Sequence, residues 1–440
     1  MSTKGSMGSQ IVTDPPKGTR DFPPEDMRMR TWLFNNFREV SRLFSFEEVD
    51  FPMVESEELY TRKAGEEIVG QLYNFEDKGG RKVALRPELT PSLARLVLQK
   101  GKAQVFPLKW FAIGQCWRYE NMTRGRRREH YQWNMDIIGV PGVEAEAELL
   151  AAIVMFFERL GITSKDVGIK VSNRKVLQAV LEKYEIQADN FAPVCVIVDK
   201  LDKLPRDVIE SELAKINVPS EAIDGILKAL TLQSFDDLEA LIGAESGAVG
   251  ELKQLFALAE GYGIQDWLQF DASVVRGLAY YTGTVFEGFD KDRKLRAICG
   301  GGRYDRLLST YGGLDTPACG FGFGDAVIVE LLKEKKLLPK FPHVVDDVVM
   351  ALEDSLKIKA AGVAAQLRKS GRVVELVIEK GKKMRWVLKQ CETLNAKFLV
   401  LLGTTEWEQG GKVTVKNLAT REQTVKTVDE LIESMSALNV

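Results

Sequence analysis

The densest group of charged side chains in the chain lies in one short segment. Five arginines and two glutamates fall between Arg118 and Glu129, in the stretch CWRYENMTRGRRREHYQWNMDIIG. An apolar run at 111–114 and an alternating run at 131–136 predict two strands joined by a basic loop at 121–128. A hairpin with a cationic tip could hold polyphosphate and the end of a nucleic acid. A solvated basic loop between two ordinary strands is the alternative interpretation.

The order of residues in this hairpin resembles motif 2 of class II aminoacyl-tRNA synthetases, in the form that histidyl-tRNA synthetases carry. Four other segments resemble the same family and follow its order along the chain: GTRD at 18–21, LRPELTP at 85–91, VRGLAYYTGTVFE at 275–287 and GGGRYD at 300–305. The segments RGLAYYTG and GFGFGDAV are most similar to those of the plant-organelle branch of the family. The resemblance spans about residues 15–330. It implies activation of histidine by ATP, followed by transfer of histidine to the 3′ end of tRNA(His).

The resemblance implies two catalytic arginines. Repulsion between the histidine carboxylate and the α-phosphate is the main obstacle to activation, so fixed guanidinium groups are the expected solution. Arg118 corresponds to the arginine that bridges the carboxylate and the α-phosphate, and Arg276 to a family arginine placed against the α-phosphate. A surface or strand-end arginine is the alternative for each. In the same ATP site, Glu120 would hold the adenine or order the loop, and Arg126 would meet the γ-phosphate side.

Three further arginines of the basic loop are candidates for the acceptor end of tRNA(His): Arg124, Arg127 and Arg128. Guanidinium groups pair well with phosphates. A solvated loop remains an equal alternative for these three side chains. The net charge of −3 offers no bulk attraction, so contact with tRNA has to rest on such local patches.

Recognition of histidine needs groups that read a neutral imidazole and a free amine. A carboxylate opposite one ring nitrogen fixes the tautomer, and a tyrosine hydroxyl can serve the other nitrogen. The positions that match the family are Glu88 and Thr90 for the α-amine, Gln132 for the amine or carboxylate, Asp136 for an imidazole N–H, and Tyr280 and Tyr281 for the other ring edge. Strand core is the alternative for both tyrosines. The glycines at 300–302 would let backbone approach the ring, although a bulge or turn explains them equally well.

The sequence departs from the family at two positions. The segment RGLAYY has Ala279 where an acid often stands. The segment GFGFGDAV at 320–327 occupies the place of motif 3, which normally ends in an arginine that packs on adenine and contacts ATP. This chain has Val327 at that position. Three interpretations are open: another cation substitutes, ATP is held differently, or activity is impaired.

Two other functions compete with that of a ligase. The first is a non-catalytic paralogue, such as the synthetase-like regulatory subunit of ATP phosphoribosyltransferase, and Val327 favours it. Three features oppose this alternative: motif 2, Arg276 and a C-terminal α/β domain. The regulatory subunit typically lacks such a domain. The second is a dinucleotide-binding enzyme that uses Gly320, Gly322 and Gly324, but GxGxG without a distal acid is weak evidence. A histidine–tRNA ligase is the function that the sequence favours.

Hydrophobic periodicity predicts an α+β catalytic domain, with an antiparallel sheet and helices, followed by a C-terminal α/β domain. Residues 47–53 predict a strand, and the strand–helix alternation after residue 344 predicts a largely parallel sheet. In the family, this C-terminal position holds the anticodon-binding domain. The expected divisions are a disordered tail at 1–14, a catalytic domain at 15–173 and 269–335, a helical insertion at 174–268, a linker at 336–343 and the C-terminal domain at 344–440.

Composition argues against several other classes of protein. The five cysteines form no CxxC pair and there are two histidines, which argues against a structural zinc site and a disulfide framework. No apolar run approaches the length of about 18 residues that a membrane span needs. Phosphate chemistry implies Mg²⁺ bound with ATP, with no metal ligand assigned. The resemblance also implies a homodimer, with its interface around residues 47–55.

The first ten residues, MSTKGSMGSQ, are small and polar, and they have the features of neither a secretory signal nor a transit peptide. They are either a remnant of recombinant expression or a native terminus. The expected location is the cytoplasm, or a chloroplast or mitochondrial matrix with the transit peptide absent from this chain.

Overall fold

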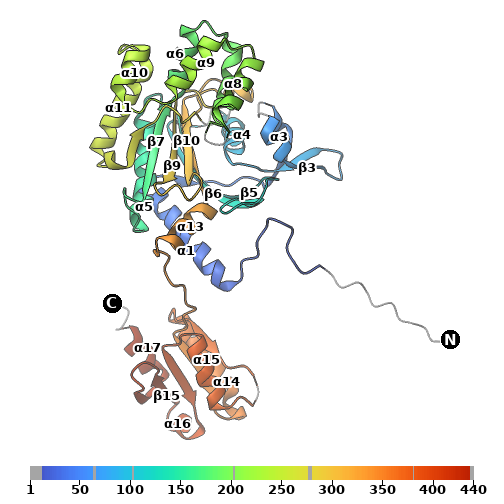
Figure 1. Cartoon of the computed structure of the whole chain (residues 1–440). Helices are drawn as coiled ribbons and strands as arrows, with labels where there is room; N and C mark the ends of the chain where they lie inside the picture. The colour runs from blue at the N-terminus through green and yellow to red at the C-terminus, as the bar shows by residue number, and fades with distance from the viewer. Residues whose placement is uncertain are drawn as a thin grey trace, which may run out of the picture. The chain divides into compact units, whose positions relative to one another are not determined.

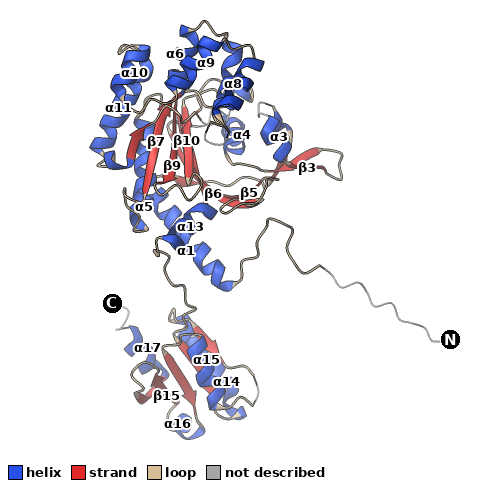
Figure 2. Cartoon of the chain, viewed as in Figure 1, coloured by secondary structure: helices blue, strands red, loops and turns tan. Residues whose placement is uncertain are grey.

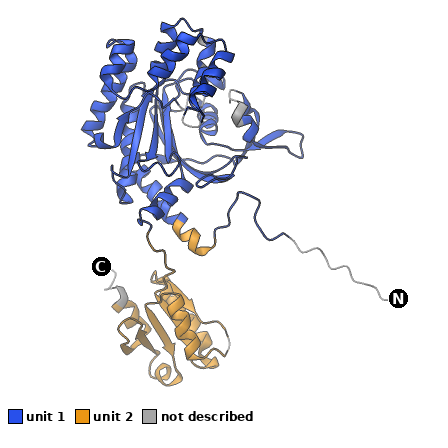
Figure 3. Ribbon diagram, in the orientation of Figure 1, with its two compact units in different colours: residues 1–22, 30–338 blue, residues 23–29, 339–440 orange. Residues whose placement is uncertain are grey.

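The computed structural model describes residues 12–62, 66–101, 104–201, 204–275, 280–379 and 381–436. Contacts divide the chain into two compact units, Met1–Phe22 with Arg30–Leu338 and Pro23–Met29 with Pro339–Val440 (Figure 3). All the predicted site residues that the structure describes lie in the first unit. None of the helices in the described ranges is long and apolar enough to cross a membrane.

A large sheet with helices around it forms the centre of the first unit (Figures 1 and 2). It has eight strands, in the order β1-β5-β6-β11-β10-β9-β7-β8. The strands are β1 (Glu47–Glu48), β5 (Leu108–Trp117), β6 (Glu129–Ile138), β7 (Val167–Asn173), β8 (Leu268–Phe270), β9 (Thr284–Asp290), β10 (Cys299–Arg303) and β11 (Ala318–Gly324). The inner strands pair antiparallel. The predicted α+β fold with an antiparallel sheet is therefore confirmed, and parallel pairing of β1 with β5 and of β7 with β8 makes the sheet mixed at its edges.

One face of this sheet is apolar, because successive side chains of a strand point to opposite faces. The buried side chains on this face include Trp133, Met135, Phe321 and Phe323. They join a core with residues of the helices α1 (Pro24–Leu43), α5 (Glu144–Arg159), α11 (Gly247–Gly261) and α13 (Asp325–Glu334). The Trp133 ring, for example, lies 4.7 Å from the ring of Phe37 in α1. The polar residues of β6 are consequently on the other face.

A small three-stranded sheet and short helices precede β5 in the chain: β2 (Val54–Ser56), α2 (Glu58–Thr61), α3 (Glu66–Gln71), β3 (Tyr73–Glu76), β4 (Lys82–Leu85) and α4 (Thr90–Lys100). The strand predicted at 47–53 is wrong, because only Glu47–Glu48 pair with β5. Pro52 has no N–H to continue a ladder. The carbonyl of Phe51 instead accepts a hydrogen bond from Arg86 Nη1 at 2.7 Å. The carbonyl of Met53 accepts one from the backbone N–H of Arg86 at 2.9 Å.

From residue 174 to residue 267 the described elements are helical: α6 (Arg174–Lys183), η2 (Ala188–Asn190), α7 (Phe191–Val198), α8 (Arg206–Lys215), α9 (Ser220–Ala229), α10 (Phe235–Ile242), α11 and η3 (Gln265–Trp267). Val180, Leu213 and Ile226 belong to an apolar cluster of their own in this region. The chain returns to the sheet through β8, which pairs with β7. Strands from before and after these helices, such as β6 and β11, are therefore neighbours in one sheet.

The second unit contains a five-stranded sheet in the order β13-β12-β14-β15-β16. Its elements are β12 (Asp347–Ala351), η4 (Asp354–Leu356), α14 (Lys357–Lys369), β13 (Val374–Leu376), α15 (Met384–Thr393), β14 (Phe398–Leu402), α16 (Thr404–Glu408), β15 (Lys412–Asn417), β16 (Gln423–Thr427) and α17 (Val428–Ser436). The predicted C-terminal α/β domain is confirmed. Its sheet is mixed and not largely parallel, because β12 pairs parallel with β13 and β14, whereas β14–β15 and β15–β16 pair antiparallel. Sequence reasoning missed β16, an edge strand with no buried residue to mark it.

Candidate active site

The polar side chains of β6 share the sheet face opposite the core with a group of glycines. Gln132, Asn134 and Asp136 alternate along β6, and their register partners in β11 are all glycine. A Cβ atom at Gly320 would lie 2.1 Å from Asp136 Oδ1, and one at Gly322 would lie 2.6 Å from Gln132 Nε2. Glycine is required at position 320, because a side chain there would collide with the buried Asp136.

Strand β10 extends this glycine face. Gly300 and Gly302 are the register partners of Gly322 and Gly320, and β10 pairs regularly with a strand on each side. The alternative that a bulge or turn explains residues 300–302 is therefore wrong. Because glycine carries no side chain, a ligand can approach the backbone of this part of the sheet.

Asp136 is buried on the glycine face, and its Oδ1 accepts a hydrogen bond from the Tyr304 hydroxyl. Burial raises the pKa of Asp136 to about 7, although the bond from Tyr304 acts to lower it. The Tyr304 ring lies 5.8 Å from the ring of Tyr280, whose hydroxyl donates to Glu88 Oε2 at 3.0 Å. Sequence reasoning gave Tyr304 no role, although its spacing of two residues from Gly302 was a signal for the same strand face.

The remaining residues predicted to bind histidine lie around this pair of hydrogen bonds. Thr90 is buried at the start of α4, and its Oγ1 accepts a hydrogen bond from Asn134 Nδ2 at 3.4 Å. Gln132 extends from the same face of β6 as Asn134. The Tyr281 ring lies 4.9 Å from that of Tyr280 and is buried in an apolar cluster, which is the packing expected of strand core. The structure thus brings the six predicted residues together.

Arg118, Glu120 and Arg126, all predicted to bind ATP, lie together where β5 ends. Arg118 Nε donates a hydrogen bond to Pro87 O at 2.9 Å, and Arg126 Nε donates to Glu120 Oε2. Burial acts to raise the pKa of Glu120, but the bond from Arg126 and the charges of Arg118, Arg126 and Arg296 lower it overall. The carboxylate is therefore held in a strongly positive surrounding. These three residues, together with Arg296, are called the ATP charge group below.

The three arginines predicted to meet tRNA have different surroundings. Arg124 forms ion pairs with two glutamates of α13. Its Nη2 lies 2.6 Å from Glu334 Oε1, and its Nε lies 3.3 Å from Glu330 Oε2. The guanidinium carbon of Arg128 lies 3.8 Å from the centre of the Tyr119 ring. Arg127 is exposed. The loop is thus tied to α13 through Arg124, while Arg127 is accessible from solvent.

The segment GTRD holds the base of the hairpin, a role that sequence reasoning did not assign. Arg20 Nε donates to Glu129 Oε1 at 2.7 Å, and Arg20 Nη2 donates to Asp325 Oδ2 at 3.0 Å. Asp325 Oδ1 in turn accepts a hydrogen bond from Tyr131 N at 2.9 Å. These bonds fix the start of β6 against the start of α13. No local pattern signals them, because the partners are 109 and 305 residues apart in the chain.

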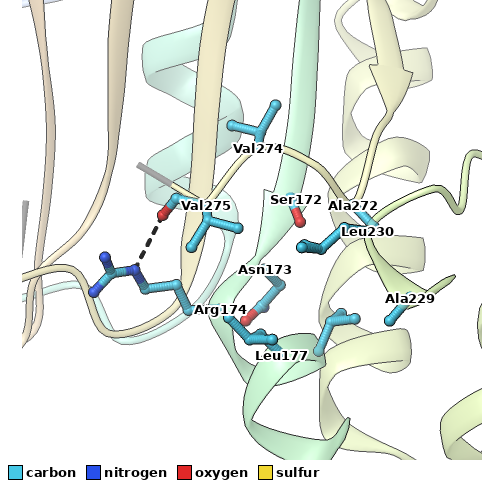
Figure 4. Close-up of a pocket in the computed structure, with 10 residues that line it drawn as sticks. Ser172, Asn173, Arg174, Leu177, Ala229, Leu230, Ala272, Val274 and Val275 are labelled. Carbon is cyan, nitrogen blue, oxygen red and sulfur yellow. Dashed lines mark hydrogen bonds between the residues drawn. The ribbon is translucent and has the colours of Figure 1, made fainter. Parts of the chain in front are cut away.

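Arg276 and Ala279 lie outside the described residues, so the predicted position of Arg276 stays a prediction. The carbonyl of Val275, just before it, accepts a hydrogen bond from Arg174 Nε at 3.1 Å (Figure 4). A pocket at this point is lined by Ser172, Asn173, Arg174, Val176, Leu177, Ala229, Leu230, Ala272, Val274 and Val275. None of the predicted site residues lines this pocket, so the candidate site is the glycine face and the ATP charge group.

The dinucleotide-binding alternative is wrong. Gly320, Gly322 and Gly324 lie in β11, which is antiparallel to both of its neighbours. A dinucleotide fingerprint needs a tight turn between a strand and a helix in a parallel βαβ unit. The glycines of β11 instead make room for the polar side chains of β6.

Comparison with known proteins agrees with this geometry. Residues 18–325 match the family Histidyl-tRNA synthetase, and residues 346–438 match the family Anticodon binding domain. The chain is 63% identical over 421 residues to a protein of Arabidopsis thaliana named Histidine–tRNA ligase, chloroplastic/mitochondrial, covering 96% of this chain and 86% of the relative. It is 36% identical to a Histidine–tRNA ligase of Leptospira biflexa, covering 97% of this chain and 98% of the relative.

A solved structure shows the same fold over nearly the whole length. The crystal structure of histidyl-tRNA synthetase from Nostoc superposes with a TM-score of 0.77 at 24% identity, covering 97% of this chain and 100% of that chain. The sequence matches add what the fold alone does not decide. The chain therefore belongs to the histidyl-tRNA synthetase family of class II aminoacyl-tRNA synthetases.

Proposed function

We propose that this protein is a histidine–tRNA ligase, which activates histidine with ATP to histidyl-adenylate and transfers the histidine to the 3′ end of tRNA(His). The observation that carries the proposal is the 63% identity to a protein named Histidine–tRNA ligase, over 96% of this chain. The structure supports it with two adjacent features. The glycine face offers groups that suit an imidazole and an amine, and the ATP charge group offers fixed cations for phosphate.

Asp136 accepts a hydrogen bond from an imidazole N–H in this proposal, and so fixes the tautomer of the substrate. Tyr304 positions Asp136 through the hydrogen bond between them. Glu88 and Thr90 bind the α-amine of histidine, and Gln132 binds its amine or carboxylate. Tyr280 and Tyr281 contact the far edge of the imidazole ring. An amino acid without an imidazole would leave these buried polar groups unpaired, which is a strong basis for rejecting it.

Activation needs an oxygen of the histidine carboxylate to attack the α-phosphorus. A new P–O bond forms while the bond to the bridging oxygen breaks, and pyrophosphate leaves. Arg118 bridges the carboxylate and the α-phosphate, Arg276 faces the α-phosphate, and Arg126 meets the γ-phosphate side. Glu120 holds the adenine or orders the loop, and its bond from Arg126 favours the second role. Cations fixed before the substrate arrives stabilise the developing charge without reorganisation.

Mg²⁺ is proposed to enter with ATP. Within the described ranges, no group of three or more His, Cys, Asp or Glu residues is arranged to hold a metal ion. This suits Mg²⁺, which keeps several waters and binds one or two carboxylates together with the phosphates of a nucleotide. Glu287 can supply such a carboxylate, because it is the register partner of Gly300 on the glycine face. The ion neutralises phosphate charge when bound.

The proposed partner in the second step is tRNA(His). Arg127, together with Arg124 and Arg128 of the same loop, is proposed to contact phosphates of the acceptor end. Residues 346–438 are proposed to contact the anticodon, because they match the anticodon-binding family. The two regions would then hold the two ends of one tRNA.

A homodimer is proposed, with residues 47–55 in the interface. Met53 and Val54 in this segment, and Leu43 shortly before it, are apolar side chains that are exposed in the single chain. Burial of such side chains between two subunits would stabilise a dimer. Sedimentation velocity is expected to give twice the mass of one chain at micromolar concentration, and a purely monomeric species would contradict this proposal.

The compartment that we propose is an organelle. The relative in Arabidopsis thaliana is named as chloroplastic/mitochondrial. Fractionation of the source cells with an antibody against this protein tests the proposal, and a signal confined to the cytosol would contradict it.

The non-catalytic regulatory alternative is not favoured. The relatives that match almost the whole chain are named ligases, at 63% and 36% identity. Residues 346–438 also match an anticodon-binding family, and a subunit that binds no tRNA has no use for such a domain. The ATP charge group supplies cations that a purely regulatory protein would not need.

The decisive experiment is exchange of pyrophosphate into ATP without tRNA, run with each standard amino acid in turn. Exchange with histidine alone is expected. If none of the amino acids supports exchange, and circular dichroism shows that the protein is folded, the ligase function is contradicted. The regulatory alternative would then be favoured.

The pH profile of histidine use tests the role of Asp136. Only the ionised carboxylate is a full acceptor for an imidazole N–H, so kcat/KM for histidine is expected to fall as the pH drops below about 7. The bond from Tyr304 lowers the pKa of Asp136, so Tyr304→Phe is expected to move the midpoint upward, by about one pH unit. The measurement is pyrophosphate exchange between pH 5.5 and pH 9.

The substrate imidazole titrates in the same range, but equally for every variant, so the difference between variants isolates the protein. Tyr262→Phe is the matched control, because the Tyr262 hydroxyl donates to Glu148 on an exposed surface. Its midpoint is expected to equal that of the wild type. A Tyr304→Phe midpoint that stays in place or moves downward would refute the assigned link to Asp136.

A further inference from the structure

Position 327 is not an open place for a cation in this fold. Val327 is buried on α13, and a Cβ atom at Gly125 would lie 3.3 Å from Val327 Cγ2. Gly125 adopts a φ of 74° in the basic loop, a backbone conformation that suits glycine. The loop therefore packs on the apolar side chain of Val327. Any cation that replaces the motif 3 arginine has to come from another element.

The register of the sheet points to one such element. Strand β10 begins at Cys299, which pairs with Phe323 near the end of β11. Strand β11 ends at Gly324 and leads directly into α13, which carries Val327. Because β10 and β11 are antiparallel, residues just before Cys299 lie at the same edge of the sheet as residues just after Gly324. Arg296 precedes β10 by three residues, and Val327 follows β11 by three residues.

The electrostatics agree with this placement, because the charge of Arg296 acts on Glu120 of the ATP charge group. The charges of Arg118, Arg126 and Arg296 all lower the pKa of Glu120. Desolvation and then the charge of Arg126 lower the pKa of Arg296, while Glu120 and Glu287 oppose this. Three guanidinium charges thus act on the one carboxylate of the ATP charge group, which makes this place suitable for an anion.

We propose that Arg296 binds the triphosphate of ATP and supplies the positive charge that the motif 3 arginine supplies elsewhere in the family. The proposal rests on the ligase function proposed above and deepens it. An arginine suits this place because its charge is permanent and its planar fork can grip two phosphate oxygens. The exposed loop between β9 and β10 carries this side chain to ATP in place of α13.

The test compares Arg296→Met with Arg293→Met in histidine-dependent pyrophosphate exchange. Arg293 is an exposed arginine of the same loop whose charge is not among those acting on Glu120. Loss of a charge-assisted contact is expected to raise KM for ATP about 10–100-fold in Arg296→Met. KM for histidine is expected to change less than about twofold, and Arg293→Met to match the wild type. Arg296→Lys keeps a positive charge without the planar fork, so its KM for ATP is expected to lie between those of the wild type and Arg296→Met.

Two inhibitors that compete with ATP separate the phosphates from the base. In Arg296→Met, inorganic tripolyphosphate is expected to bind more weakly by the same factor as ATP, whereas adenosine is expected to bind unchanged. An unchanged KM for ATP, an equal loss in Arg293→Met, or a loss confined to adenosine would overturn the proposal.

Different results would contradict the ligase function and the role of Arg296. Absence of exchange in the wild-type protein would contradict the ligase function. Binding of tripolyphosphate, measured by calorimetry on the wild-type and Arg296→Met proteins, needs no turnover and still decides the role of Arg296. Equal affinity in these two proteins would overturn that role whatever the activity.

Discussion

Replacing Arg118 by glutamine is expected to lower the rate of histidine-dependent pyrophosphate exchange by about 10³-fold or more, with the fold intact. The bond from Arg118 Nε to Pro87 O, at 2.9 Å, uses one of the five N–H donors of the guanidinium and fixes its plane. The other four donors, on the terminal nitrogens, can then bind the carboxylate and the α-phosphate together. Glutamine keeps an N–H donor but has no charge, so the two anions would repel each other without compensation.

The matched control is Arg127→Gln, which makes the same change at an exposed position of the same hairpin. Pyrophosphate exchange needs no tRNA, so this variant is expected to keep the wild-type rate within about twofold. Charging of tRNA(His) is the step at which Arg127 is expected to matter. Exchange by Arg118→Gln above a tenth of the wild-type rate would contradict the catalytic role of Arg118.

Replacing Glu146 by glutamine is expected to destabilise the first unit by about 3–5 kcal/mol. The carboxylate is fully buried in α5 and accepts hydrogen bonds from Arg303 Nε at 2.7 Å and Nη2 at 2.6 Å. Burial acts to raise the pKa of Glu146, so the group depends on Arg303 for its charged form. Glutamine would leave the buried guanidinium with Asp305 as its remaining counter-charge, at 3.2 Å and partly exposed.

Thermal unfolding measures this effect, and Tm is expected to fall by about 6–20 °C. Glu210→Gln is the matched control, because it breaks the exposed pair with Arg206 at 2.7 Å, and solvent screening makes such a pair weak, so Tm is expected to stay near that of the wild type. The double variant Glu146→Leu with Arg303→Met removes both buried charges and is expected to recover most of the loss. A fall in Tm for Glu146→Gln no larger than for Glu210→Gln would show that the buried pair contributes little.

Much of the first unit could be predicted from local patterns. The alternation at 131–136 predicted a strand, and the same alternation places Trp133 in the core and Asp136 on the glycine face. The strand predicted at 47–53 was wrong and β16 was missed, for related reasons. A proline and an exposed edge give no periodic signal, because no buried face selects the residue types there.

By itself, the sequence determined the family, the residue types of the site and the face of each long strand, because these depend on composition and on spacing along the chain. Only the tertiary structure decided the partners: Tyr304 for Asp136, 168 residues apart, and Arg303 for Glu146, 157 residues apart. It also put Glu120 within reach of the charge of Arg296, while Val327 packs under the basic loop. Such pairs follow from strand register and helix packing, which join distant segments and leave no trace in the local order of residues.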